Sequence, residues 1–175
     1  GSNRAYMKQL ILLRHAKSSW ADGGRDFDRP LNARGERDAP EMAARFAARG
    51  FHPQLIVASG ARRALATAQK MAAVFDYPLA DIDIVDALYE ASEQTWIAQI
   101  GALPAHCAAV LMVGHNPVIT AVANRLCPLA RIGDMPTCAM LWLQYPPEVG
   151  AWSDVLRSVP AHWDFDYPKR PPTAG

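Results

Sequence analysis

Three short apolar runs in this 175-residue sequence each lead into side chains that can bind phosphate or attack it. Arg14 and His15 follow the run 9–13, Arg63 lies just beyond the run 55–58, and His115 follows the run 110–113. Guanidinium groups bind phosphate oxygens with paired N–H donors, and a neutral imidazole is a nucleophile near neutral pH because its unperturbed pKa is about 6.5. Parallel strands present their carboxyl ends at one edge of a sheet, where ligands bind. The pattern predicts that both arginines and both histidines converge on one anion-binding crevice.

The elements that must position these side chains begin with the runs themselves. Each run is continuously apolar, which is typical of strands buried on both faces of a parallel sheet. Between the first two runs, apolar residues recur at helical spacing from Ala39 to Ala47, with Asn32 as the predicted N-cap and Gly50 as the stop. Pro40 is expected to kink this helix or to mark a second start.

Further along the chain, periodicity and capping residues predict four more elements. They are a helix over 64–75, a short edge strand within 81–85, a helix capped by Ser92, and a helix capped by Asn116 with Pro117 at its first position and its end near Leu126. The segments 139–143 and 153–157 flank a Pro-Pro turn and predict an antiparallel hairpin.

The domain organisation follows from these elements. We expect one domain over 7–160, with residues 1–6 an expression scar or a ragged start and the proline-rich segment 161–175 a loosely packed tail. The predicted fold class is α/β, a three-layer α/β/α sandwich with a mostly parallel, mixed sheet.

Composition limits the classes of partner. Lys and Arg total 18 against 17 Asp and Glu, so the net charge of +1 provides no global attraction to nucleic acid or to an anionic membrane. The three cysteines (Cys107, Cys127 and Cys138) are widely spaced, without the paired spacing of zinc or redox sites, and are typical of idle thiols in a reducing compartment. No apolar run is long enough to cross a bilayer, and no signal peptide is visible. The expected location is cytoplasmic.

Three motifs together resemble a known family. The run Leu13-Arg14-His15-Ala16 resembles the RHG signature of the histidine phosphatase superfamily, Ser59-x-x-x-Arg63-Ala64-x-x-Thr67 its second motif, and Gly114-His115 its third. The resemblance extends from Leu10 to about Leu143, and Asp26-x-Asp28-Arg29-Pro30-Leu31-x-x-x-Gly35 and His115-Asn116-Pro117 are similar to the SixA-type phosphohistidine phosphatases. It implies a phosphoglycerate-mutase-like fold.

The resemblance also implies roles for the four residues. His15 would attack phosphorus and form a phosphohistidine intermediate, while Arg14, Arg63 and His115 would bind the phosphoryl oxygens; neither a metal nor a cofactor is expected. The motif glycine is Ala16 here, so its backbone must accept a Cβ, which requires a negative φ. Only 52 positions separate Arg63 from His115, so no large insertion closes the pocket. An open pocket suits a phosphorylated residue on a protein surface.

The sequence gives the fewest indications for the residue that would act as general acid. Glu90 lies in the region where relatives keep their general acid, but it also precedes a predicted helix, whose dipole alone would favour a carboxylate there. Asp26 and Asp28 are expected to order the loop after His15.

Three functions remain open from the sequence: a phosphatase for phosphohistidine on a protein such as a relay domain, a phosphomonoesterase for small metabolites or nucleotides, and a non-catalytic phosphate-binding module. The intact set of arginines and histidines argues against the third. A monomer or weak dimer is expected.

Overall fold

The computed structural model describes residues 7–20 and 23–171, and the strands among them form one mixed sheet in the order β3-β2-β4-β1-β5-β6. The strands are β1 (Gln9–Arg14), β2 (Leu55–Ala58), β3 (Asp83–Ile84), β4 (Ala109–Gly114), β5 (Met140–Gln144) and β6 (His162–Asp166). β1 to β4 run parallel, whereas β5 is antiparallel to both β1 and β6. The predicted mostly parallel, mixed sheet is confirmed, as is the edge strand within 81–85.

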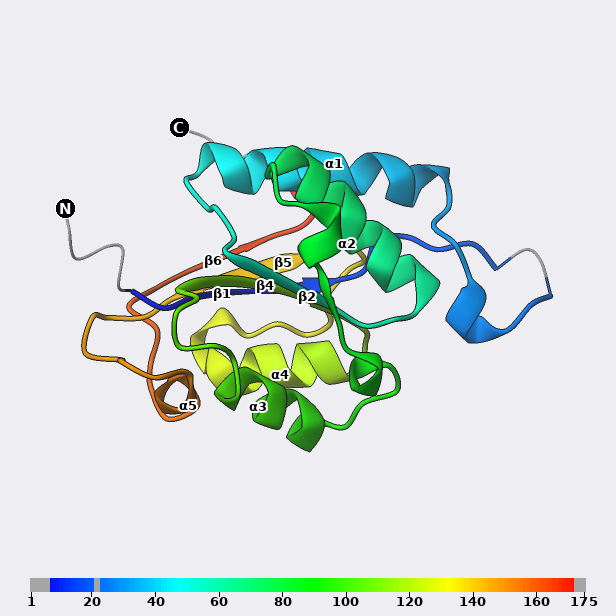
Figure 1. Ribbon diagram of the computed structural model, residues 1–175. Helices are drawn as coiled ribbons and strands as arrows, with labels where there is room; N and C mark the ends of the chain where they lie inside the picture. Colours follow the sequence, from blue (N-terminus) through cyan, green and yellow to red (C-terminus); the bar gives the residue numbers. More distant parts are fainter. Residues whose placement is uncertain (1–6, 21–22, 172–175) are drawn as a thin grey trace.

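Helices cover both faces of this sheet. They are α1 (Ala33–Ala48), α2 (Arg62–Val74), α3 (Glu93–Gly101), α4 (Val118–Leu126) and α5 (Trp152–Val155). Figure 1 shows α1 and α2 on one face of the sheet and α3, α4 and α5 on the other. The three-layer arrangement is therefore confirmed. Within the described residues, no helix has both the length and the apolar character to cross a membrane.

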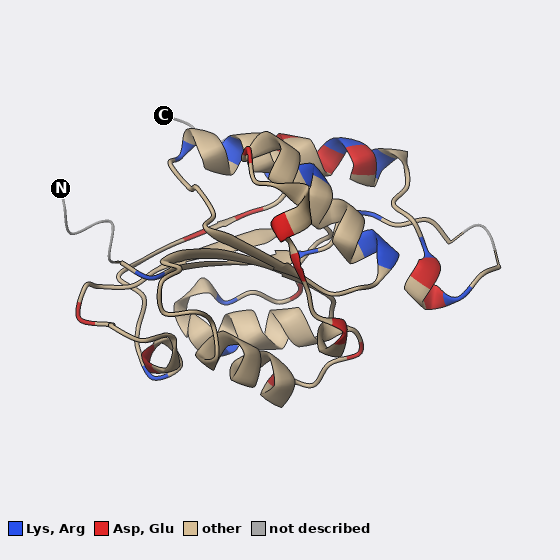
Figure 2. Ribbon diagram, viewed as in Figure 1, with Lys and Arg blue, Asp and Glu red and all other residues tan. Residues whose placement is uncertain are grey.

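The central strands separate two apolar cores. Successive side chains of β1 alternate between them: Leu10 and Leu12 join the cluster with α3 and α4, while Ile11 and Leu13 join the cluster with α1 and α2. Burial on both sides explains why these strands are continuously apolar. Figure 2 shows the charged residues mainly on helix surfaces, in loops and at strand ends; β1 carries charge only at its last residue, Arg14, and β2 and β4 carry none.

Two predictions about helix starts are corrected. α1 is one helix that contains Pro40, so a second start there is wrong; the Asn32 side chain accepts from Gly35 N at 2.9 Å, as predicted for the N-cap. α4 begins at Val118, and Asn116 does not cap it. The Asn116 amide instead donates to Met135 O at 3.0 Å and to Asp134 Oδ1 at 2.7 Å, because the segment around Met135 folds back against it.

The predicted hairpin between 139–143 and 153–157 is wrong in its second strand. β5 pairs with β6, while the segment expected to be a strand contains α5. Trp152 and Val155, three residues apart, are both buried, and the Trp152 indole donates to Cys107 O at 2.9 Å. Residues three apart lie on the same face of a helix, so burial of both side chains favours a helix over a strand in this segment.

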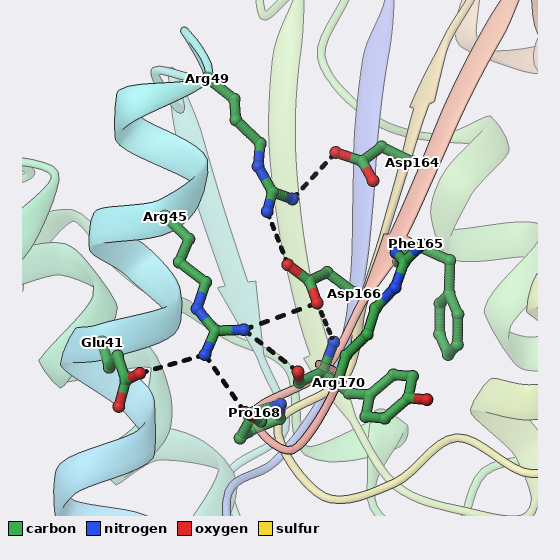
Figure 3. Close-up of polar contacts among 9 residues, drawn as sticks. Glu41, Arg45, Arg49, Asp164, Phe165, Asp166, Pro168 and Arg170 are labelled. Atoms are coloured by element: carbon green, nitrogen blue, oxygen red, sulfur yellow. Dashed lines mark hydrogen bonds and ion pairs between the residues drawn. The ribbon is translucent and has the colours of Figure 1, made fainter. Parts of the chain in front are cut away.

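The expected loosely packed tail is also wrong, so the domain extends past residue 160. Within the segment expected to be loose, β6 completes the sheet, and ion pairs join it to Arg45 of α1 and to Arg49, the residue that follows α1 (Figure 3). Arg49 donates to Asp164 at 2.9 Å and to the buried Asp166 at 2.7 Å. Arg45 donates to the carbonyl oxygens of Tyr167 and Pro168, both at 3.1 Å. Residues 1–6 and 172–175 lie outside the described part of the chain.

Candidate active site

The carboxyl ends of three neighbouring strands position the site. β4 lies between β1 and β2, with Arg14 in register with Gly114 and Ala58 in register with Val113. The residues that follow these strands therefore meet at one edge of the sheet. α2 starts four residues after β2 and brings Arg63, in its first turn, to the same edge. The structure thus brings Arg14, His15, Arg63 and His115 together.

His15 is a buried imidazole whose orientation is fixed. Its Nδ1 lies 2.7 Å from Ala16 O. A carbonyl can only accept, so Nδ1 carries the proton and Nε2 keeps its lone pair. Burial, with smaller contributions from the neighbouring His115, Arg63 and Arg14, lowers the pKa of His15 to about 3. His15 is therefore a neutral imidazole, with an unprotonated Nε2, over the whole physiological pH range.

Beside the His15 imidazole, His115 has a ring nitrogen that finds no hydrogen-bond partner in the described part of the chain. Its ring centroid lies 5.2 Å from that of His15, and its Nε2 lies 2.8 Å from Ser59 Oγ. Ser59 Oγ accepts from Ala61 N at 3.2 Å and still has a proton that it can donate to His115 Nε2. In the tautomer that accepts this proton at Nε2, the ring proton of His115 lies on Nδ1. That Nδ1 is buried and has no partner among the described residues. Burial, aided by the charge of Arg63, lowers the pKa of His115 to about 4.

Arg63 is held from two sides. Its Nε donates to His15 Nε2 at 3.4 Å, while Nη1 donates to Asp26 O at 2.7 Å and Nη2 to Asp26 Oδ2 at 3.0 Å. The Tyr89 hydroxyl donates to the same carboxylate oxygen at 2.7 Å, and its ring packs edge-on against His115. This hydrogen bond from Tyr89, together with Arg63, lowers the pKa of Asp26 to about 2. Asp26 therefore ties its loop to Arg63, which is predicted to bind phosphate.

Arg14 is fixed by a loop from the far end of the chain. Its Nη1 donates to Met135 O at 2.8 Å, and the same carbonyl accepts from Asn116. Arg14 Nε is buried and has no partner among the described residues. The site therefore presents two unsatisfied donors, on Arg14 and His115, around the lone pair of His15.

The alanine that replaces the motif glycine fits its position. Among the described residues, the positive φ values belong to Asp76, Glu90, Arg131, Cys138 and two glycines, so Ala16 has none of the strain that would demand glycine. Ala16 N donates to Thr67 Oγ1 at 3.0 Å, and that hydroxyl donates to Arg63 O at 2.7 Å. Thr67 therefore links the loop after His15 to the helix that carries Arg63.

Glu90 lies beside the site, at its outer side. It is exposed, and with His115 it lines a pocket of about 450 Å³. No hydrogen bond or ion pair joins Glu90 to another side chain within the described residues, so it is near His115 and open to solvent.

Three contributors escape prediction from the sequence: Tyr89, Ser59 as a partner of His115, and the Met135 carbonyl. Ser59 opens the second motif at a strand end, a placement that could have indicated it. Tyr89 and Met135 lie in loops, and nothing in their local sequence indicates which element they contact. Within the described part of the chain, no cluster of three or more His, Cys, Asp or Glu side chains is arranged to hold a metal ion.

Comparison with known proteins agrees with this geometry. The model of the histidine phosphatase superfamily (branch 1) matches residues 10–100, which include Arg14, His15 and Arg63. An uncharacterized chloroplastic protein of Arabidopsis thaliana is 43% identical over 84 residues, 47% of this chain but only 38% of that protein. An uncharacterized protein of Mycobacterium tuberculosis is 30% identical over 166 residues, which cover 90% of this chain and 100% of that protein.

One solved structure is similar to this chain over nearly the whole length of both. The candidate phosphohistidine phosphatase SixA from Agrobacterium tumefaciens superposes with a TM-score of 0.74 at 31% identity, covering 92% of this chain and 98% of that one. Family model, relatives and fold agree with the phosphate-binding geometry at the sheet edge. The chain belongs to the histidine phosphatase superfamily, in which it is SixA-like, and its chemistry is that of a phosphatase.

Proposed function

We propose that this protein removes phosphate from phosphohistidine on a protein, with His15 as the nucleophile and a phosphohistidine intermediate. One observation carries the proposal: a buried imidazole, neutral because its pKa is about 3, directs its unprotonated Nε2 into a ring of cationic and N–H donors. A phosphoryl group needs such donors because negative charge spreads over its oxygens in the transition state.

The reaction then proceeds in two displacements. His15 Nε2 forms a bond to phosphorus while the bond to the leaving nitrogen breaks, and Arg14, Arg63 and His115 bind the equatorial oxygens. The leaving imidazole, protonated on its other nitrogen, departs neutral. Water then attacks the phosphoryl group on His15, which releases inorganic phosphate and restores the neutral imidazole. Tyr89 and Asp26 touch Arg63 and His115 from outside and act as positioning residues.

A protein substrate is favoured over a small one by the exposure of the site's outer wall. Glu90, Pro117 and Ala121 are exposed, and no segment of the described residues between Arg63 and His115 forms an additional domain over them. The alternative, a phosphomonoesterase for small metabolites or nucleotides, uses the same nucleophile. A non-catalytic module would have no need for a neutral, oriented His15. The cytoplasmic location and the monomeric or weakly dimeric state stay predictions.

One panel of substrates tests the proposal. A histidine-phosphorylated protein and several phosphate monoesters are compared, and rapid quenching with labelled substrate should trap acid-labile phosphate on the wild type and none on His15→Ala. Retained turnover in His15→Ala, without a labelled wild-type intermediate, would overturn the mechanism. Dialysis against a chelator should leave the rate unchanged, because Arg14 and Arg63 already supply positive charge. Recovery of a lost rate with a divalent ion would contradict this.

Glu90 distinguishes the two substrate classes. An alkoxide leaving group needs a proton from a positioned acid, which contributes roughly 10²–10⁴-fold, whereas a departing imidazole needs little help. Glu90→Gln should therefore slow phosphohistidine hydrolysis by less than about tenfold, and should slow monoesters more as the leaving group becomes more basic. A loss of several orders of magnitude on phosphohistidine itself would favour the phosphomonoesterase.

A further inference from the structure

We propose that the pocket next to His115 is a subsite for a lysine or arginine side chain that flanks the phosphorylated residue of the protein substrate. The inference rests on the proposed function, because it identifies which phosphoproteins the site prefers.

The pocket adjoins the phosphate-binding donors. Its volume is about 450 Å³, and its lining residues are Glu90, Ala91, Glu93, His115, Asn116, Pro117, Val118 and Ala121. His115 is only 7% exposed, and its Nδ1 has no partner among the described residues. A phosphoryl group on His15 would satisfy that nitrogen. Because His115 also lines the pocket, a side chain that flanks the phosphorylated residue of a bound polypeptide can reach it.

The wall of the pocket is largely apolar and belongs to two structural elements. Pro117, Val118 and Ala121 come from the start of α4, and Ala91 comes from the segment before α3. Apolar surface of this kind is covered well by the methylene stem of a long side chain, which leaves its polar end in water. A short polar side chain would leave this apolar wall exposed to water.

The rim of the pocket is acidic and selects a cation. Glu90 is exposed and has no hydrogen bond or ion pair to another side chain in the described part of the chain. Glu93 pairs with Arg125 at 3.7 Å, and both of these side chains are more than a third exposed. The pair neutralises itself, so Glu90 supplies the uncompensated negative charge. An apolar wall with an anionic rim matches lysine or arginine, whereas a purely apolar side chain would leave Glu90 without a partner.

Paired substrates and paired variants test the subsite. Phosphohistidine peptides carry lysine, norleucine or glutamate at each position near the phosphorylated residue; norleucine keeps an aliphatic stem and lacks the charge. Ala121 is exposed on α4, so Ala121→Lys and Ala121→Glu place opposite charges on the pocket wall without disturbing the core. Glu148→Gln changes an exposed carboxylate in the loop after β5, at the opposite edge of the sheet, and is the matched control. Phosphoramidate, which is too small to reach the pocket, reports basal activity.

The two substitutions should act in opposite directions. At one peptide position, lysine should raise kcat/KM over norleucine by about two- to fivefold, the range of an exposed ion pair. Ala121→Lys should remove this preference, Ala121→Glu should increase it, and high salt should weaken it. Phosphoramidate turnover should stay within about twofold in both. Equal rates for lysine and norleucine at every position, or identical responses of the two variants, would overturn the subsite while phosphoramidate turnover persists. Failure to hydrolyse phosphohistidine at all would instead overturn the proposed function.

Discussion

Lowering the pH from 7.5 to 5 should destabilise this protein through two buried histidines. Burial lowers the pKa of His15 from 6.5 to about 3 and that of His115 from 6.5 to about 4. Below pH 6.5 these histidines therefore bind protons in the unfolded chain but not in the folded chain. The free energy of unfolding falls as the pH falls, and the contribution of the two histidines is fully present only above pH 6.5. At pH 5, about 1.5 pH units below the ordinary pKa, each histidine costs about 2 kcal/mol, or about 4 kcal/mol for both.

Urea unfolding followed by circular dichroism measures this loss. With a slope of about 2 kcal/mol per molar urea, the midpoint should fall by about 2 M between pH 7.5 and pH 5. His15→Gln should remove about half of the shift, whereas His52→Gln, at an exposed position, should leave it unchanged. Carboxylates contribute little because their ordinary pKa values lie below pH 5. A midpoint that stays constant over this range would refute a neutral His15, and with it the nucleophile proposed here.

Three further substitutions test the contacts around the site and the end of the sheet. Thr67→Val should lower the free energy of unfolding by about 1–3 kcal/mol, because the buried Ala16 N–H loses its acceptor; Thr67→Ser should restore most of it in urea titrations. Asp26→Asn should lower kcat/KM about tenfold by releasing Arg63, measured against phosphoramidate, with the folded structure unchanged by circular dichroism. Asp166→Asn should cost about 1–3 kcal/mol of stability, and an unchanged melting curve would mean that the ion pairs to α1 do not hold β6.

The parallel half of the fold could be predicted from sequence because burial on both faces leaves a simple pattern. β1, β2 and β4 are continuous apolar runs, and each lies between the two cores. The antiparallel half could not be predicted in the same way. β5 pairs with β6, a strand that begins 18 positions after β5 ends, so no local pattern indicates the pairing. The aspartates of β6 are typical of a polar tail, and only the folded structure shows that Arg45 and Arg49 lie opposite them.

The clustering of the proposed catalytic residues was predictable for a related reason. Arg14, His15 and His115 lie at the ends of strands, and Arg63 lies in the first turn of the following helix, so topology alone brings them together. Their partners come from loops, whose position no local pattern encodes. Neither the pairing of Asp26 with Arg63 nor the contact of Met135 with Arg14 leaves a periodic signal in the sequence.

These loop contacts explain how the site can hold positive charge and a neutral imidazole together. Each proposed phosphate ligand is fixed by a hydrogen-bond partner from a different segment: Arg14 by Met135 O, Arg63 by Asp26 and His115 by Ser59 Oγ. The ligands need not reorganise when phosphate arrives, which is the condition under which fixed dipoles stabilise a transition state. The same burial excludes a proton from His15 and makes the fold sensitive to acid. The neutral state of His15, on which its proposed role as nucleophile depends, and the predicted instability at low pH therefore have one physical cause.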